Sequence, residues 1–295
     1  MTPLRTWLRT RLPAPVVDRM RDTPIWSDLI APLSHRPRAA LNALRTRGRF
    51  EDVERFCLFI GYPRSGHTLL GSLINAHRET LISHELNALR FVNARFTRAE
   101  LYALILERDR WFAGLDRHWT GYDYTVPGQW HGRWERLRVI GDKRGGGSAA
   151  LLSRHPDLLD RLQRTVGVPI LAIHHVRDPF DNIATISRRD ERPLADAIAM
   201  YFGLAEAATA ALDRLPPDAQ LLVYHEDLVA DPGATLDRVA AALGLTPDPA
   251  WREACAARIF PSARRTRDTV PWTPDLEATV RSHMAAFPHL ARYGA

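Results

Sequence analysis

The sequence predicts an α/β protein of three layers, in which helices cover both faces of a central parallel sheet. Short apolar runs rich in Ile, Leu and Val alternate with longer amphipathic stretches along residues 51–295. Near-continuous apolar runs are typical of parallel strands buried on both faces, and the helical stretches between them supply the crossovers that such strands require. Ligands of such sheets bind outside the carboxyl ends of the strands.

The expected elements follow from these runs in chain order. The strands are expected at 56–62, 80–84, 137–142, 169–176 and 219–225. The helices are expected at 68–76, 86–94, 98–112, 149–165, 179–189, 193–214, 232–243, 250–257 and 274–286. Residues typical of helix amino termini support several of these helices. In the helix expected at 232–243, for example, Pro232 occupies the first helical position after Asp231.

No internal repeat and no low-complexity linker divides the body of the chain. We therefore expect a single domain at 51–295, preceded by a basic helical segment at 1–50. Composition is that of a soluble globular protein, with 45% apolar and 25% charged residues. Cys57 and Cys255 indicate free thiols in a reducing compartment. With no apolar run near the roughly 20 residues of a membrane helix and no signal-peptide core, the expected location is cytoplasmic.

The positive charge is concentrated near the amino terminus. Residues 1–50 hold ten arginines and three aspartates, whereas the remainder holds 30 basic and 31 acidic residues. A nearly neutral body argues against a general nucleic-acid-binding protein. Leu4, Trp7, Leu8 and Leu12 recur at helical spacing, so residues 1–12 either lie on an anionic membrane surface or, as the favoured alternative, pack on the domain.

A glycine-bounded loop follows the first expected strand. The stretch GYPRSGHT, residues 61–68, fits G-x-x-x-x-G-K-[ST] except that His67 replaces the lysine and Arg64 appears before it. The loop precedes an amphipathic helix, whose amino end attracts anions. We expect a phosphate site formed by the amides of Ser65, Gly66, His67, Thr68 and Leu69.

Two charged residues stand at the ends of other expected strands. Lys143 is the only lysine among 40 basic residues, and it ends a strand in VIGDKRGGG. A compact ammonium differs chemically from the planar guanidinium used elsewhere. Glu85 ends a strand in LISHELNAL, where it is either a general base or a charge stabilised by a helix amino terminus.

A further candidate lies in HHVRDPFDNIATISRR, residues 174–189. An apolar strand runs into Arg177, and Thr185 follows eight residues later on the next helix. A guanidinium and a hydroxyl placed in this way can hold a second phosphate together. Taken alone, the segment is better explained as an ordinary strand-to-helix turn with a solvated arginine.

Together these stretches resemble the sulfotransferases that use PAPS (3′-phosphoadenosine 5′-phosphosulfate) and release PAP. YPRSGHTLL resembles their 5′-phosphosulfate loop, VRDPFDNIAT their 3′-phosphate segment, and YHEDLVADPGATLDRVAAALGL their Y-E-D-L segment with its following helix. The order and separations agree over about residues 55–285. The resemblance implies a P-loop-like sulfotransferase fold, cofactor PAPS, no metal, and an enzyme of the class EC 2.8.2.-. The arginine- and alanine-rich composition indicates a GC-rich bacterial genome.

The resemblance also assigns roles. It places Arg64 on the 5′-phosphosulfate and Arg177 with Thr185 on the 3′-phosphate, with Ser187 a less favoured substitute for Thr185. Glu85 corresponds to the catalytic glutamate of tyrosylprotein-type and carbohydrate-type members, and Lys143 to the lysine that stabilises the bridging oxygen. Further residues are implied more loosely: Arg265 and Arg267 in a late basic loop over the nucleotide, and His225 where the family usually has tyrosine.

The acceptor side is expected at residues 111–136, a long connection rich in tryptophan and tyrosine. It either walls an acceptor pocket or packs as a lid without touching the acceptor. The acceptor is expected to be a small molecule, a carbohydrate or a glycolipid. Two rival functions remain: a P-loop small-molecule kinase using ATP and Mg²⁺, disfavoured by the missing lysine, and a non-catalytic nucleotide-binding scaffold, disfavoured by the presence of Glu85 and Lys143.

Overall fold

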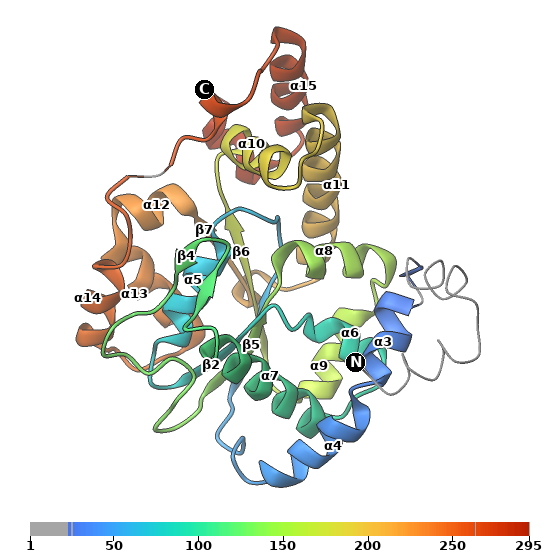
Figure 1. Cartoon of the computed structure of the whole chain (residues 1–295), viewed down its shortest axis with the longest axis vertical. Helices are drawn as coiled ribbons and strands as arrows, with labels where there is room; N and C mark the ends of the chain where they lie inside the picture. The colour runs from blue at the N-terminus through green and yellow to red at the C-terminus, as the bar shows by residue number, and fades with distance from the viewer. Residues whose placement is uncertain (1–22, 25, 263, 295) are drawn as a thin grey trace.

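The predicted three-layer α/β fold is confirmed by a computed structural model of the chain, which describes residues 23–24, 26–262 and 264–294. Five parallel strands form one sheet in the order β2-β5-β1-β6-β7 (Figure 1). Their bounds are β1 (Arg55–Phe59), β2 (Thr80–His84), β5 (Val139–Lys143), β6 (Ile170–Val176) and β7 (Gln220–Tyr224). Each strand lies at the predicted place, with bounds that differ by at most a few residues.

Side-chain alternation along the strands divides the core into two layers. On β1, Phe56 and Leu58 point to one face and Cys57 and Phe59 to the other, and all four are buried. The first face is covered by α6 (Ala88–Asn93), α7 (Arg98–Ala113), α8 (Gly145–Arg154), α9 (Leu158–Val166) and α11 (Leu194–Leu212). The second is covered by α5 (His67–Asn75), α12 (His225–Ala230), α13 (Pro232–Leu243) and α14 (Pro249–Ala256).

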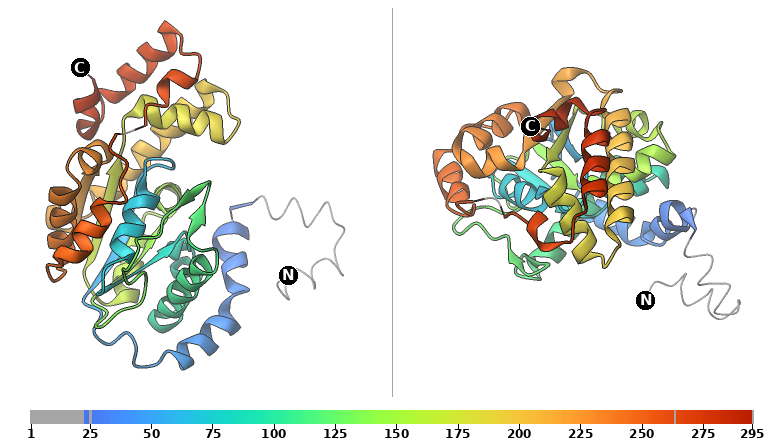
Figure 2. Two further views of the ribbon diagram at one scale, coloured as in Figure 1. Left: turned by 60° about the vertical axis from the view of Figure 1, so that its left-hand side comes forward. Right: turned by 90° about the horizontal axis from the view of Figure 1, so that it is seen from above.

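A third apolar cluster lies beyond the carboxyl ends of the strands. It joins α10 (Pro179–Arg189) and α11 to α15 (Pro274–Met284), around Tyr62 and Val176. Figure 2 shows this part as a projecting lobe that carries the carboxyl terminus. Short helical turns complete the element order: η2 (Pro217–Ala219), η3 (Arg267–Thr269) and η4 (Pro288–Tyr293).

The expected single helix at 149–165 is wrong, because the structure has two helices there. Pro156 cannot donate a backbone hydrogen bond, and it forces His155 out of the helical region, to φ −136° and ψ 73°. The chain therefore turns between α8 and α9. The first of these helices also begins earlier than expected, at Gly145 in the glycine run.

Residues before the first strand pack on the domain. They form η1 (Trp26–Ile30), α3 (Ala31–Leu33) and α4 (Arg36–Arg45), for which the sequence predicted a helical segment at 1–50 without separate bounds. Asn42 on α4 donates a 2.7 Å hydrogen bond to Glu107 on α7. The predicted helix at 1–12 lies outside the described residues, and the domain boundary at residue 50 stays a prediction.

Within the described ranges, α11 alone is long and apolar enough to cross a membrane by length and composition. It packs in the core against α8 and α10. Cys57 and Cys255 are free and buried.

Gly141 tests the packing of the central strands. A Cβ there would lie 2.1 Å from the carbonyl oxygen of Cys57 and 2.8 Å from its Cβ. Because both atoms belong to the neighbouring strand β1, Gly141→Ala is expected to lower the free energy of unfolding by about 3 kcal/mol, measured by urea denaturation followed by circular dichroism. The matched control is Gly203→Ala on α11, where a Cβ meets nothing within 4 Å. That change is expected to stabilise the protein by about 0.5–1 kcal/mol; equal stability of the two variants would contradict the packing described.

Candidate active site

All five strands deliver polar residues to one edge of the sheet. The loop at 60–66 follows β1, Glu85 follows β2, Lys143 ends β5, Arg177 follows β6 and His225 follows β7. Because the strands are parallel, their carboxyl ends meet at the same edge, as Figure 1 shows below the α10–α15 lobe. The predicted location of the site and the observed arrangement therefore agree at the level of strand ends.

The glycine-bounded loop has the geometry of an anion site. Gly66 has φ 95°, a conformation that favours glycine, and it stands immediately before α5. The amides of Gly66, His67 and Thr68 donate to no backbone carbonyl among the described residues, so they remain available to a ligand. The amide of Leu69 differs from the expectation, because it donates to the Gly66 carbonyl at 2.9 Å. The Ser65 hydroxyl lies 3.2 Å from Nδ1 of His67.

Lys143 joins this loop to Glu85. Its Nζ donates to Oγ1 of Thr68 at 2.9 Å and to Oε1 of Glu85 at 3.0 Å. The lysine side chain is only 2% exposed. Its stem passes against Gly71 of α5, where a Cβ would lie 2.7 Å from Cγ of the lysine. The glycine thus leaves the space through which the ammonium reaches the loop.

Glu85 is held on both carboxylate oxygens. Arg144, the residue after the lysine, donates to Oε2 at 2.5 Å, while Lys143 occupies Oε1. Glu85 also has φ 56°, which is uncommon outside glycine. Such strained backbone costs about 1–3 kcal/mol and clusters at functional sites.

The loop that carries Glu85 is fixed by Asp142, which is fully buried on β5. Its carboxylate accepts hydrogen bonds from the amides of Leu86 and Ala88, both at 2.9 Å, and from the Ser83 hydroxyl at 2.7 Å. Asp142 therefore orients the backbone around Glu85 without touching the candidate reaction centre. It acts as a positioning residue.

The ionisation states of Glu85, Lys143 and His67 follow from their burial and from the charges next to them. Burial raises the pKa of Glu85, but Lys143 and Arg144 outweigh it and lower that pKa to about 2. Burial lowers the pKa of Lys143 to about 8, although Glu85 opposes the shift. Burial, helped by Lys143, also lowers the pKa of His67 to about 3. At neutral pH the carboxylate is ionised, the ammonium is protonated and His67 is neutral.

Arg177 and Thr185 meet as the sequence predicts, and a third residue joins them. The Arg177 guanidinium lies 3.5 Å from the Thr185 hydroxyl and 3.3 Å from the Thr266 hydroxyl, and it also contacts the carbonyl of Arg264. The two threonine hydroxyls are 2.9 Å apart. Ser187 turns away, because its hydroxyl donates to the carbonyl of Arg192.

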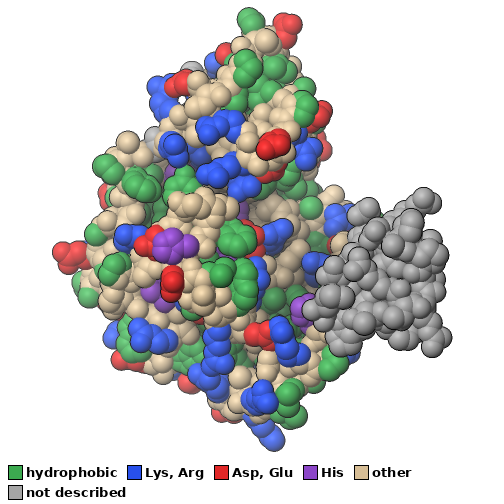
Figure 3. Space-filling view, viewed as in Figure 1, with side chains coloured by type: hydrophobic (Ala, Val, Ile, Leu, Met, Phe, Trp, Pro, Cys, Tyr) green, Lys and Arg blue, Asp and Glu red, His purple; other side chains and the backbone are tan. Residues whose placement is uncertain are grey.

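The basic segment at residues 264–267 lies over the cluster formed by Arg177 and Thr185. Arg267 forms a 2.5 Å ion pair with Asp178 at the start of α10 and lies over the Phe180 ring. Arg265 is exposed and lies 3.8 Å from Asp268. The predicted arginines therefore flank Thr266, which makes the direct contact with Arg177. Figure 3 shows basic side chains gathered over the α10 region.

Arg64 is not brought to Lys143 or Glu85. Its guanidinium forms a 3.0 Å ion pair with Asp190, the residue that ends α10. Its backbone has φ 63°, so the loop is strained at this position as well as at Glu85. The arginine thus links the anion loop to the α10 lobe.

Two histidines beneath the loop have no hydrogen-bond partner. Both ring nitrogens of His175 and Nδ1 of His225 are buried and unpaired within the described part of the chain. A Cβ at Gly66 would lie 2.7 Å from Nδ1 of His225 and 3.1 Å from Cε1 of His175. Buried polar atoms are normally paired, so these nitrogens favour a polar ligand at the loop.

The aromatic connection forms part of the same face. A hairpin of β3 (His118–Trp119) and β4 (Tyr122–Asp123) places Trp119 5.1 Å from the His84 ring, next to Glu85 in sequence. Tyr122 accepts a 3.1 Å hydrogen bond from Arg264. Trp134 instead packs on Phe50, away from the hairpin. Phe112, near the start of the connection, also stacks on the His84 ring with the ring centres 4.0 Å apart, so Phe112 and the 118–124 part of the connection both lie beside the site.

Four residues of the site were not predicted from the sequence: Asp142, Arg144, His175 and Thr266. Asp142 and Arg144 flank Lys143 in GDKR, so their position beside the lone lysine was a usable signal. Thr266 lies between two predicted arginines. His175 carried no signal, because its unpaired nitrogens depend on the packing of β6 under the loop.

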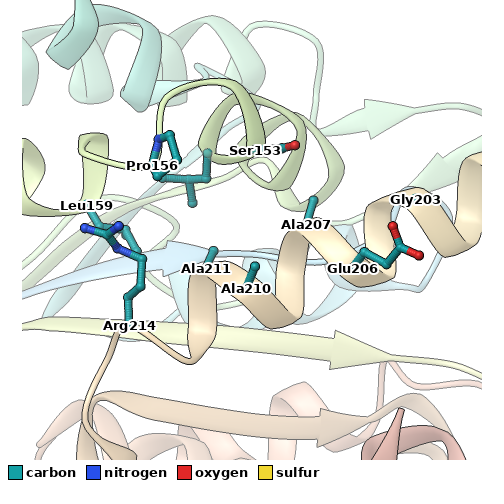
Figure 4. A pocket seen from close by; sticks show the side chains of 10 residues that line it. Ser153, Pro156, Leu159, Gly203, Glu206, Ala207, Ala210, Ala211 and Arg214 are labelled. Atoms are coloured by element: carbon teal, nitrogen blue, oxygen red, sulfur yellow. The ribbon is translucent and has the colours of Figure 1, made fainter. Parts of the chain in front are cut away.

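A separate hollow of about 260 Å³ lies between the α8–α9 turn and α11 (Figure 4). Leucine, proline and alanine side chains form most of its wall, with Glu206 and Arg214 among its polar lining residues. None of the candidate active-site residues described above lines it. No group of three or more His, Cys, Asp or Glu residues suited to a metal occurs in the described ranges.

The fold and the site define a three-layer α/β protein with a P-loop-like anion loop and two clusters of basic residues at the sheet edge, one around Lys143 and one around Arg177. Residues 170–250, which include Arg177, Thr185 and His225, match the model of the sulfotransferase family. The match covers the VRDPFDNIAT and YHEDL segments, and the loop at 61–68 lies outside it. No curated protein matches the sequence.

Solved sulfotransferases are similar in fold. The sulfotransferase domain from the curacin biosynthetic pathway is 17% identical, with 79% of this chain and 97% of that chain covered and a TM-score of 0.48. Sulfotransferase STF1 from Mycobacterium tuberculosis H37Rv is 17% identical, with 84% and 82% covered and a TM-score of 0.49. Mouse sulfotransferase SULT7A1, solved with PAP, is 13% identical, with 87% and 92% covered and a TM-score of 0.43.

The Glu85 ion pairs predict a pH-dependent contribution to stability. The folded-state pKa of about 2 lies below the ordinary value of 4.5, so the contribution is complete above about pH 4.5 and is lost as the pH falls toward 2. Glu85→Gln is therefore expected to reduce the free energy of unfolding by on the order of 3 kcal/mol at neutral pH. The difference from the parent should shrink from about pH 5 to about pH 3 in urea titrations.

Glu253→Gln on α14 is the matched control for this change, since that carboxylate is exposed. Its difference from the parent should stay within about 0.5 kcal/mol across the same range. A Glu85→Gln difference that is independent of pH would show that the carboxylate is not held by the two cations.

Proposed function

We propose that this protein is a PAPS-dependent sulfotransferase of the class EC 2.8.2.- that sulfates a hydroxyl group of a small-molecule, carbohydrate or glycolipid acceptor. The observation that carries the proposal is the contact of the Lys143 ammonium with the Thr68 hydroxyl inside the anion loop. In a P-loop kinase that hydroxyl binds Mg²⁺. Here the Lys143 ammonium bonds that hydroxyl where a kinase would have Mg²⁺. A single fixed positive charge suits a donor with one 5′-phosphate and no triphosphate.

The residues present fit such a donor at two ends. The free amides of Gly66, His67 and Thr68, with the unpaired nitrogens beneath them, would hold the 5′-phosphosulfate. Arg177, Thr185 and Thr266 would hold the 3′-phosphate, with Arg265 and Arg267 beside them. Arg64, fixed by Asp190, would contribute charge at the 5′ end. When bound, PAPS supplies the sulfuryl group that the acceptor oxygen receives.

Glu85 and Lys143 carry the proposed chemistry. Glu85 takes the proton of the acceptor hydroxyl as that oxygen forms its bond to sulfur. Lys143 donates to the oxygen on which negative charge develops as the old bond to sulfur breaks. A carboxylate with a pKa of about 2 is a weak base. If Lys143 bonded the leaving oxygen in place of Glu85, the carboxylate would lose one of its two cations and its pKa would rise.

The hairpin around Trp119 supports an acceptor pocket on the Glu85 side. An aromatic surface beside a carboxylate suits a sugar or aryl ring that carries a hydroxyl. We infer a bacterial, cytoplasmic enzyme from the arginine-rich composition and from the free thiols. Contact of residues 1–12 with the inner face of the membrane remains a prediction, because those residues lie outside the described ranges.

The nucleotide preference is the first test. PAP (3′,5′-ADP) at about 100 times its dissociation constant should stabilise the protein by about 2.7 kcal/mol, which raises the melting temperature by about 5 °C or more. EDTA should not change this shift. Arg177→Ala should reduce it, whereas Arg252→Ala on α14 should not, because Arg252 pairs with Asp237 outside the site. A larger shift with ATP and Mg²⁺ that EDTA abolishes would support the kinase instead.

The roles of Glu85 and Lys143 are tested by turnover. Radiolabelled PAPS with panels of sugars, glycolipids and aryl alcohols measures transfer. Glu85→Gln should lower kcat by about 10²–10⁴-fold and Lys143→Ala by about 10²–10³-fold, because each removes a group that acts in the transition state. Both variants should still be stabilised by PAP. Full activity of either variant would remove that residue from the mechanism, and binding of PAP without transfer by the parent would favour the scaffold.

A further inference from the structure

Helix α4 turns its large apolar side chains away from the protein. Leu41 is 47% exposed and Leu44 is 72% exposed. The side that packs on the domain carries small or polar residues instead, with Ala39 and Thr46 buried and Asn42 bonded to Glu107 of α7. A helix on the surface of a soluble protein normally buries its apolar stripe, so this orientation is inverted.

The outward leucines form a ridge on one side of the helix. Positions 37, 41, 44 and 48 recur at helical spacing, which places Pro37, Leu41 and Leu44 in one line. Arg38 and Arg45 lie along one flank of this ridge, and Arg47 follows the helix. Arg38 pairs with Glu107, whereas Arg45 and Arg47 have no ion-pair partner in the described part of the chain. We call Leu41, Leu44, Arg38, Arg45 and Arg47 the α4 face.

The charge that the α4 segment itself brings to the ridge has one sign, while Glu107 of α7 pairs with Arg38 and Glu51 lies near Gly48. Between residues 29 and 50 the sequence has five arginines and no acidic residue. Arg49 lies over the Trp134 ring at the end of this stretch. Figure 2 shows α3 and α4, in blue, as an arc on the outside of α7, and in Figure 3 basic and apolar side chains mix along the lower edge. The surface is therefore both apolar and strongly basic.

We propose that the α4 face is a docking surface for anionic lipid membranes. An apolar ridge flanked by arginines is the arrangement with which amphipathic helices lie in the headgroup region. The leucines enter the boundary of the acyl chains, and the arginines meet lipid phosphates. This inference does not depend on the proposed sulfotransferase activity, since none of these residues belongs to the site.

The charge disfavours two other occupants. Residues 1–22 of the same chain contain five arginines and two aspartates, so they are basic like the α4 face. A second copy would bring an identical basic ridge against this one. Both arrangements place like charges together, whereas an anionic bilayer satisfies the arginines and the leucines at once.

The test is sedimentation of the full chain with large vesicles. Vesicles of phosphatidylcholine and phosphatidylglycerol in equal parts should pellet the protein, and vesicles of phosphatidylcholine alone should not. Leu41→Gln with Leu44→Gln should lower the partition coefficient by about tenfold or more. Arg45→Gln with Arg47→Gln should lower it by about fivefold for each arginine, and added salt should do the same.

Controls separate this surface from general stickiness and from the site. Phe260→Gln removes another exposed apolar side chain, 67% exposed, and Arg252→Gln removes another exposed arginine; neither should change partitioning. The α4 variants should keep the parent's melting temperature and its shift with PAP. The proposal would be overturned if the Leu41→Gln, Leu44→Gln variant bound the vesicles as well as the parent does. It would also be overturned if the parent bound equally to vesicles with and without phosphatidylglycerol. Concentration-dependent self-association that the leucine changes abolish would assign the face to a second copy and also overturn it.

Discussion

The site depends on one buried ammonium shared between two acceptors. Lys143 reaches the edge of the sheet beneath α5 and bonds both the Thr68 hydroxyl of the anion loop and the Glu85 carboxylate. Its desolvation would be costly without these partners, so lysine, loop and carboxylate constrain one another. The remaining features of the site serve this contact: the space at Gly71, the left-handed backbone of Glu85 and the second cation at Arg144.

The sheet makes such a contact possible because its parallel strands end together. β5 lies between β2 and β1, so its last residue stands next to both the glutamate and the loop. Asp142 on the same strand fixes the backbone of the glutamate loop, and consecutive residues thus position and neutralise one carboxylate. On the other side of the sheet centre, β6 presents Arg177 to a segment near the carboxyl terminus. The basic residues around Lys143 and those around Arg177 therefore lie on either side of the central strand β1.

The arginines of the site and those of α4 have different surroundings. Around the site each guanidinium is fixed by a carboxylate or a hydroxyl, as in the pairs Arg64–Asp190 and Arg267–Asp178. On α4 the arginines at 45 and 47 are exposed and unpaired among the described residues, beside outward leucines. The first arrangement gives an ordered site for a small anion, and the second suits a broad anionic surface.

The sequence by itself determined the sheet, the strand positions and the residues at the strand ends, because apolar runs and glycine spacing depend on local chemistry. It located Arg64, Glu85, Lys143, Arg177 and Thr185 without showing which of them touch. Tertiary structure decided that Lys143 bonds Thr68 and Glu85, that Arg64 pairs with Asp190, and that Thr266 completes the Arg177 group. It also turned the leucines of α4 outward. These outcomes depend on contacts between residues far apart in the chain, which local periodicity does not encode.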